Sequence, residues 1–158
     1  MGRKQTSRVI TFGGVGAIAV LVAFMVLLQV QSTQNNAFRK SIDNIALDAV
    51  ALTQQYQGEE NRWTNKQYDN KTMITIVDNY LPRYQQLIDR ANALDSPERY
   101  KDARVYLVSA IESEKESNQH FRNYLSTGDL SEYQRSSDLL TKSLAESANY
   151  DATIRAAG

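Results

Sequence analysis

The chain has 158 residues, with 18 basic and 18 acidic side chains and a formal net charge of zero, a length that suits one domain of modest size. It contains no cysteine, which excludes disulfides, thiolate metal sites and cysteine nucleophiles, and its single histidine excludes multi-histidine metal centres. Two prolines and seven glycines are too few for a β-rich or low-complexity protein, so we expect an all-α fold.

The first feature along the chain is an apolar segment, residues 9–30, which carries no charged side chain. As a helix it would be about 33 Å long, close to the thickness of the hydrocarbon core of a bilayer. We therefore expect an uncleaved, single-pass signal anchor in the plasma or inner membrane. The short tail of residues 1–8 is basic, which places it in the cytoplasm by the positive-inside rule and residues 31–158 outside. The basic side chains of the tail are Arg3, Lys4 and Arg8.

Four small residues of the apolar segment stand at small-xxx-small spacing, which allows close approach of a second membrane helix. These candidates for contact between membrane helices are Gly13, Ala17, Ala19 and Ala23. The alternative is that glycine and alanine are simply common in such segments.

Residues 31–158 follow helical spacing and predict four helices. The expected ranges are 33–57, 72–94, 97–126 and 130–156. The first carries a coiled-coil-type stripe at steps of four and three, made of Phe38, Ile42, Ile45, Ala49, Leu52 and Tyr56. Gly58 is expected to end this helix, with residues 59–71 forming either a loop or a short helix. Pro82 predicts a kink or a break in the second helix.

The third and fourth helices have recognisable ends. Ser96 is expected to cap the third, Gly128 to end it and Asp129 to cap the fourth. The fourth is expected to bury Tyr133, Leu140, Leu144, Ala148 and Ile154. Similar helix lengths and short connections favour an antiparallel, up-down four-helix bundle over a single coiled-coil rod.

The sequence carries no recognisable catalytic or metal-binding pattern. Glu116 and His120 lack the Glu-x-x-His spacing of di-iron bundles and are better interpreted as an i,i+4 surface pair. There is no phosphate-binding glycine loop outside residues 9–30 and no nucleophile elbow. We expect a non-enzymatic protein without a metal or cofactor. Because the outer domain is net acidic, nucleic acid is not an expected partner.

Residues 100–111 are apolar around more than one helix face, which predicts either central packing or contact with a partner. The partner-contact candidates are Tyr100, Val105, Tyr106 and Val108, to which Trp63 is added because it stands alone in a polar stretch. Asn70 begins an Asn-Lys-Thr sequon and is a possible N-glycosylation site.

Three functions are compatible with these features. The first is an accessory or structural subunit of a membrane or envelope complex, with other membrane proteins as partners. The second is a sensor-like module that binds a small molecule or peptide, suggested by the polar core positions Glu114, Ser117 and Ser137. The third is a self-associating envelope spacer. The layout is similar in outline to the four-helix sensor domains of chemoreceptors, but this sequence shows no second membrane span, so we assign no family.

Overall fold

The computed structural model describes the backbone of residues 9–157 and the side chains of residues 33–157. The chain divides into two compact units, residues 1–37 and residues 38–158, and the core described below lies in the second. In the part of the chain that the structure describes, no helix is long and apolar enough to cross a membrane. The anchor predicted over residues 9–30 therefore gains no support from the structure, and its side chains lie outside the described part.

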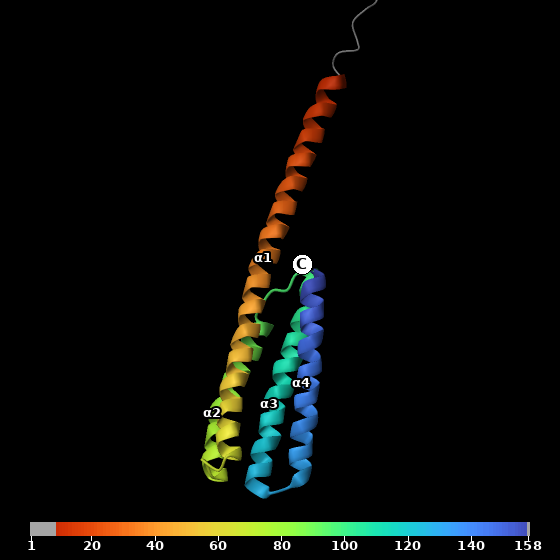
Figure 1. The fold of residues 1–158 in the computed structure, drawn as a ribbon. Coiled ribbons are helices and arrows are strands. Elements are labelled where there is room, and N and C mark those ends of the chain that lie inside the picture. Colours follow the sequence, from red (N-terminus) through yellow and green to blue (C-terminus); the bar gives the residue numbers. More distant parts are fainter. Residues whose placement is uncertain (1–8, 158) are drawn as a thin grey trace, which may run out of the picture. The chain divides into compact units, whose positions relative to one another are not determined.

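The described backbone is helical, without strands, and the expected all-α fold is confirmed. Its elements are α1 (Val9–Thr64), α2 (Asn70–Asn92), the 3₁₀ turn η1 (Glu98–Tyr100), α3 (Lys101–Thr127) and α4 (Leu130–Ala157). From residue 38 onward the helices lie side by side, and the chain reverses at each short connection (Figure 1).

Helix α1 does not end at Gly58 as predicted; it continues to Thr64. One glycine inside a helix costs only about 1 kcal/mol relative to alanine. Packing beyond it outweighs that cost, because Trp63 meets Phe121 of α3 edge to face with ring centroids 5.2 Å apart. The segment predicted as a loop or short helix is therefore the last turn of α1 followed by a tight connection over residues 65–69.

Helix α2 begins at a conventional cap and passes through its proline without a break. The carboxylate of Asp69 accepts a hydrogen bond from the backbone N–H of Thr72 at 2.7 Å. Of the two alternatives predicted at Pro82, the break is wrong, since α2 is continuous there, and the kink stays a prediction. Val77 and Tyr84, on either side of the proline, are fully buried, and this packing holds the helix together across the missing hydrogen bond.

The C-terminal end of α3 follows the prediction, but its N-terminal end does not. Ser96 makes no capping hydrogen bond; a 3₁₀ turn precedes the helix instead. At the other end Gly128 adopts a left-handed φ of 74°, as expected of a helix-terminating glycine. Asp129 accepts the backbone N–H of Ser131 at 2.8 Å and starts α4, which confirms its predicted capping role.

The predicted stripe of α1 is confirmed, because all six of its residues are buried. The predicted face of α4 is wrong except at Ile154. Helix α4 instead buries Ser143, Tyr150, Ile154 and Ala157 and leaves Tyr133, Leu140, Leu144 and Ala148 exposed. The hydroxyl of Ser117 on α3 donates to the backbone carbonyl of Ser136 at 2.7 Å, which brings a serine-bearing face of α4 against α3.

Candidate ligand-binding groove

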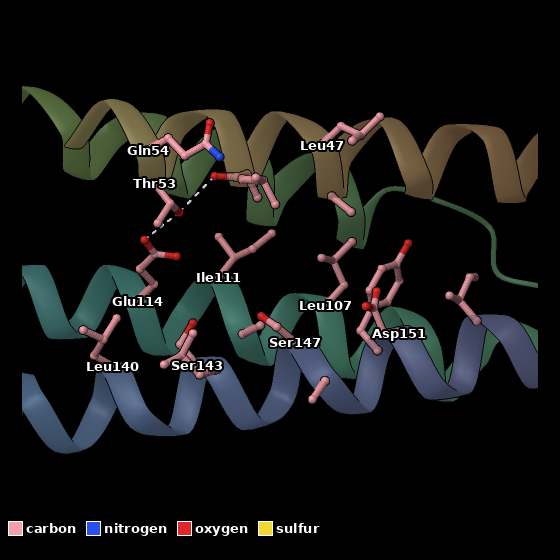
Figure 2. A pocket seen from close by; sticks show the side chains of 18 of the residues that line it. Leu47, Thr53, Gln54, Leu107, Ile111, Glu114, Leu140, Ser143, Ser147 and Asp151 are labelled. Atoms are coloured by element: carbon pink, nitrogen blue, oxygen red, sulfur yellow. Dashed lines mark hydrogen bonds between the residues drawn. The ribbon is translucent and has the colours of Figure 1, made fainter. Parts of the chain in front are cut away.

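A groove of about 690 Å³ runs between α1 and α4, with α3 as its floor. Figure 2 shows Leu107 and Ile111 of α3 between Leu47 on the α1 wall and Leu140 on the α4 wall. Most of the lining is apolar: Ala46, Leu47, Ala49 and Val50 from α1, Leu107, Ala110 and Ile111 from α3, and Leu140, Leu144, Ala148 and Ile154 from α4. The space is comparable to that of small-molecule sites in other proteins.

The groove remains open because the residues at its centre are too small to fill it. Ala110 of α3 and Ser143 of α4 are buried but short, while the larger Leu47 and Leu144 are 67% and 66% exposed at the rim. Large apolar side chains therefore flank the space instead of closing it. This is the direct consequence of the face that α4 turns toward α3.

One end of the groove is closed by a hydrogen bond between its two walls. The hydroxyl of Tyr150 on α4 donates to the carboxylate of Asp43 on α1 at 3.0 Å. Burial raises the pKa of the Tyr150 hydroxyl, and the neighbouring Asp43 charge raises it further. The tyrosine therefore stays protonated and remains a donor in this contact.

The other end of the groove carries the carboxyl group of Glu114, from α3. Its Oε1 atom accepts hydrogen bonds from the hydroxyls of Thr53 on α1, at 2.6 Å, and Tyr84 on α2, at 2.9 Å (Figure 2 draws the first). Both donors use the same oxygen, so Oε2 accepts neither bond. Burial raises the pKa of Glu114, and the two hydrogen bonds partly oppose that shift.

Beyond Glu114 lies a second, more polar cavity of about 260 Å³, which we call the polar pocket. It shares Gln57, Glu114 and Leu140 with the groove, so the two spaces adjoin. Its other lining residues come from α1, α3 and α4: Tyr56, Glu60, Asn61, Trp63, Thr64, Ser117, Asn118, Phe121, Tyr133, Ser136 and Ser137.

The polar pocket contains groups whose bonding is incomplete. The hydroxyl of Tyr56 and the Nδ2 atom of Asn118 are buried without a hydrogen-bond partner. Burial, together with the charge of Glu114, raises the pKa of Glu60 to about 7. Unpartnered polar atoms in a protein interior are uncommon and costly, so these groups are the clearest sign of a site.

The predicted partner-contact residues do not form one surface. Tyr100 is buried and stacks on Phe38 with centroids 5.3 Å apart, Tyr106 and Val108 are partly buried against the core, and Val105 is 58% exposed. Most of the segment from 100 to 111 therefore packs in the centre of the bundle, which is the first of the two alternatives predicted for it.

The side chains of Trp63 and Asn70 are hydrogen-bonded to each other. The indole Nε1 of Trp63 donates to Oδ1 of Asn70 at 2.9 Å, and Nδ2 of Asn70 donates to the Leu125 carbonyl at 3.3 Å. Both atoms of the predicted sequon amide are thus engaged. The side chains of the predicted membrane-helix contacts, Gly13, Ala17, Ala19 and Ala23, lie outside those that the structure describes.

His120 does not pair with Glu116 as predicted. Its Nδ1 lies 2.7 Å from Oε2 of Glu132 on α4, which also accepts a hydrogen bond from Asn123 at 3.0 Å. The partner was missed because the contact joins two helices, and helical spacing reveals only contacts within one. Within residues 33–157, no three His, Asp or Glu side chains are grouped closely enough to hold a metal ion.

Sequence reasoning identified part of this site. Glu114 lines both cavities and the buried Ser117 lines the polar pocket, as expected of polar residues on core-facing positions. Ser137 also lines the polar pocket, but it is exposed and the prediction that it faces the core is wrong. It missed Glu60 and Asn118, because Glu60 falls beyond the glycine at which α1 was expected to end.

Comparison with known proteins adds no assignment: no protein-family model, curated protein or solved structure matches this chain.

Proposed function

We propose that the helical bundle is a non-enzymatic binding module whose α1–α4 groove captures a small apolar or amphiphilic molecule. The observation that carries this proposal is the groove itself, a space of about 690 Å³ lined mainly by apolar side chains, with the small Ser143 and Ser147 along its α4 wall and ionisable groups at its two ends. Ligand sites commonly combine a large apolar surface with a few polar groups that fix orientation.

The dimensions of the groove favour an elongated ligand. At 1.5 Å per residue, the lining stretches 43–57 of α1 and 140–154 of α4 are each about 21 Å long. One leaflet of a bilayer's hydrocarbon core is about 15 Å thick, so a lipid-like chain would fit lengthwise. A short extended peptide would also fit, but the scarcity of polar groups along the middle of the groove offers its backbone few partners.

We further propose that this module is held at the plasma or inner membrane by residues 9–30. The support comes from the sequence: an uncharged apolar segment of bilayer-spanning length, preceded by a basic tail. In this arrangement the tail is cytoplasmic, the bundle is extracytoplasmic, and the lipid bilayer is the chain's first partner. The groove would then sample molecules outside the cell or near the membrane surface.

Photolabelling tests the binding proposal directly. The full-length chain in phosphatidylglycerol nanodiscs is irradiated with a long-chain alcohol that bears a diazirine on its chain, and labelled residues are mapped by mass spectrometry. We expect labels on the α1 and α4 walls. Ala148→Trp should plug the groove and abolish them, while Ala152→Trp, on an exposed position of α4 that does not line the groove, should not. Labels spread over the bundle surface, or unchanged in both variants, would refute the proposal.

A second candidate function is the accessory subunit, in which the groove receives a helix of a larger membrane complex. The observation that favours it is the exposed apolar rim, with Leu47, Val50 and Leu144 more than half exposed. A photocrosslinker placed at Leu144 should then capture one membrane protein in native membranes, whereas the same crosslinker at the exposed Asn149 should not. Equal capture from both positions would count against it.

The self-associating spacer has less support. That hypothesis depended on the stripe of α1, which is buried within the chain's own bundle. A stripe already covered by α2, α3 and α4 has no apolar surface left for a second copy.

A further inference from the structure

The polar pocket has the chemical character of a site for a positive charge. Two carboxyl groups, Glu60 and Glu114, line it together with the rings of Trp63, Phe121 and Tyr133. Aromatic faces attract cations through the ring quadrupole, and pairing such faces with carboxylates is a common way to bind an ammonium group. The inference below rests on the proposed function, because it concerns the ligand of the same groove.

No positive side chain balances these carboxyl groups. The residues that line the polar pocket include no lysine, arginine or histidine. Among residues 33–157, the ion pairs within 4.0 Å include neither Glu60 nor Glu114. Both groups are partly buried, which makes ionisation costly, and this burial together with the Glu114 charge raises the pKa of Glu60 to about 7. A bound cation would remove that cost by supplying the missing charge.

Two further polar side chains among the pocket residues lack hydrogen-bond partners. Tyr56 is 2% exposed and Asn118 is 5% exposed, yet the Tyr56 hydroxyl and the Asn118 Nδ2 atom have no hydrogen-bond partner. They belong to different helices, α1 and α3, and both line the same cavity.

The position of the pocket relative to the groove determines the rest of the ligand. The two spaces adjoin at Glu114, Gln57 and Leu140, so a molecule could place its head in the polar pocket and its chain along the groove. We propose that the ligand is a cationic amphiphile, with an amine head group held by Glu60 and Glu114 and an apolar chain lying between α1 and α4. The groove contributes apolar burial and the polar pocket selects the charge.

Competition among three probes of equal chain length tests the inference. Dodecylamine, dodecanol and dodecanoate are titrated against photolabelling of the full-length chain in phosphatidylglycerol nanodiscs. Emission of Trp63, the single tryptophan of the chain, gives an independent signal from the polar pocket. We expect dodecylamine to compete about tenfold better than dodecanol, and dodecanoate to compete worst.

Glu60→Gln keeps the shape of the side chain and removes its charge, so it should reduce the preference for amine over alcohol about tenfold. The matched control, Glu59→Gln, changes the neighbouring carboxyl group, which does not line the pocket, and should leave the preference unchanged. Comparing the ratio between variants cancels any unequal partitioning of the probes into the nanodisc.

The outcomes separate this inference from the proposed function. If all three probes compete equally and Ala148→Trp still abolishes labelling, the groove binds apolar chains and the cationic head group is refuted. If dodecanoate competes best, the charge assignment is likewise refuted. If no probe competes and the Trp63 emission does not change, the proposed function itself fails.

Discussion

The carboxyl group of Glu60 should make the stability of the bundle depend on pH in the neutral range. Burial raises its pKa from an ordinary value of 4.5 to about 7 in the folded protein. The folded chain therefore binds this proton more tightly than the unfolded chain. Stability is greatest below the unfolded pKa and decreases as the pH rises from about 4.5 through about 7.

The size of this effect follows from the shift. Each pKa unit of difference between the unfolded and folded protein corresponds to 1.36 kcal/mol. The rise of the Glu60 pKa from 4.5 to about 7 therefore lowers the free energy of unfolding by about 3 kcal/mol between the acid and alkaline limits. The pocket carries one more carboxyl group, Glu114 on α3, and the weakly acidic Tyr56 on α1; α4 contributes no charged group to it. The Glu114 charge is part of the cause, so removing Glu60 should also lower the cost of ionising Glu114.

Urea unfolding of the full-length chain, followed by circular dichroism between pH 5 and pH 8, measures this dependence. Glu60→Gln cannot ionise, so it should be more stable than wild type by about 3 kcal/mol at pH 8 and by less than about 1 kcal/mol at pH 5. Glu59→Gln, on the same turn of α1 but outside the pocket, should have a small effect at every pH. If the difference between wild type and Glu60→Gln is the same at pH 5 and pH 8, the burial argument is wrong.

Three other perturbations follow from the packing, each measured by urea unfolding at one pH. Tyr84→Phe removes a donor to Glu114 and should destabilise the bundle by about 1–2 kcal/mol, and an unchanged stability would contradict the hydrogen bond. Gly58→Ala should stabilise α1 by about 1 kcal/mol, since nothing lies within 4 Å of where the methyl group would stand, whereas Gly128→Ala should destabilise by about 1 kcal/mol because its φ is 74°. Ile42→Ala empties a fully buried position and should cost about 2–5 kcal/mol; a loss below 1 kcal/mol would mean that the core is loosely packed there.

The sequence predicted the helices well because their apolar spacing is regular and their boundaries carry strong local signals. The stripe from Phe38 to Tyr56, the glycine at 128 and the capping Asp129 are all read within one or two turns of chain. The errors occurred where distant contacts override local preference. Gly58 is too weak a breaker once Trp63 packs on another helix, and that packing cannot be read from spacing alone.

The site was harder to predict than the fold for the same reason. Helix α4 has apolar residues on more than one face, so its periodicity allows two orientations, and the pattern favoured the wrong one. The observed orientation buries Tyr150, Ile154 and Ala157, and it is accompanied by hydrogen bonds to other helices, such as that from Ser117 to Ser136. Because the orientation of α4 opens the groove, the groove could not have been anticipated without these contacts between helices.

The two sides of the bundle differ in how completely their side chains fill the space between the helices. Where α1 and α2 meet α3, Leu52, Met73 and Tyr84 are buried, and the Tyr84 hydroxyl is hydrogen-bonded. Where α1 and α3 face α4, small residues lie at the centre, leucines remain in water at the rim, and buried polar atoms lack partners. A spacer needs only the first kind of packing, and the second lowers stability unless another molecule covers it. That asymmetry is the physical reason for looking for the ligand between α1 and α4, and for beginning with molecules that carry both a positive charge and an apolar chain.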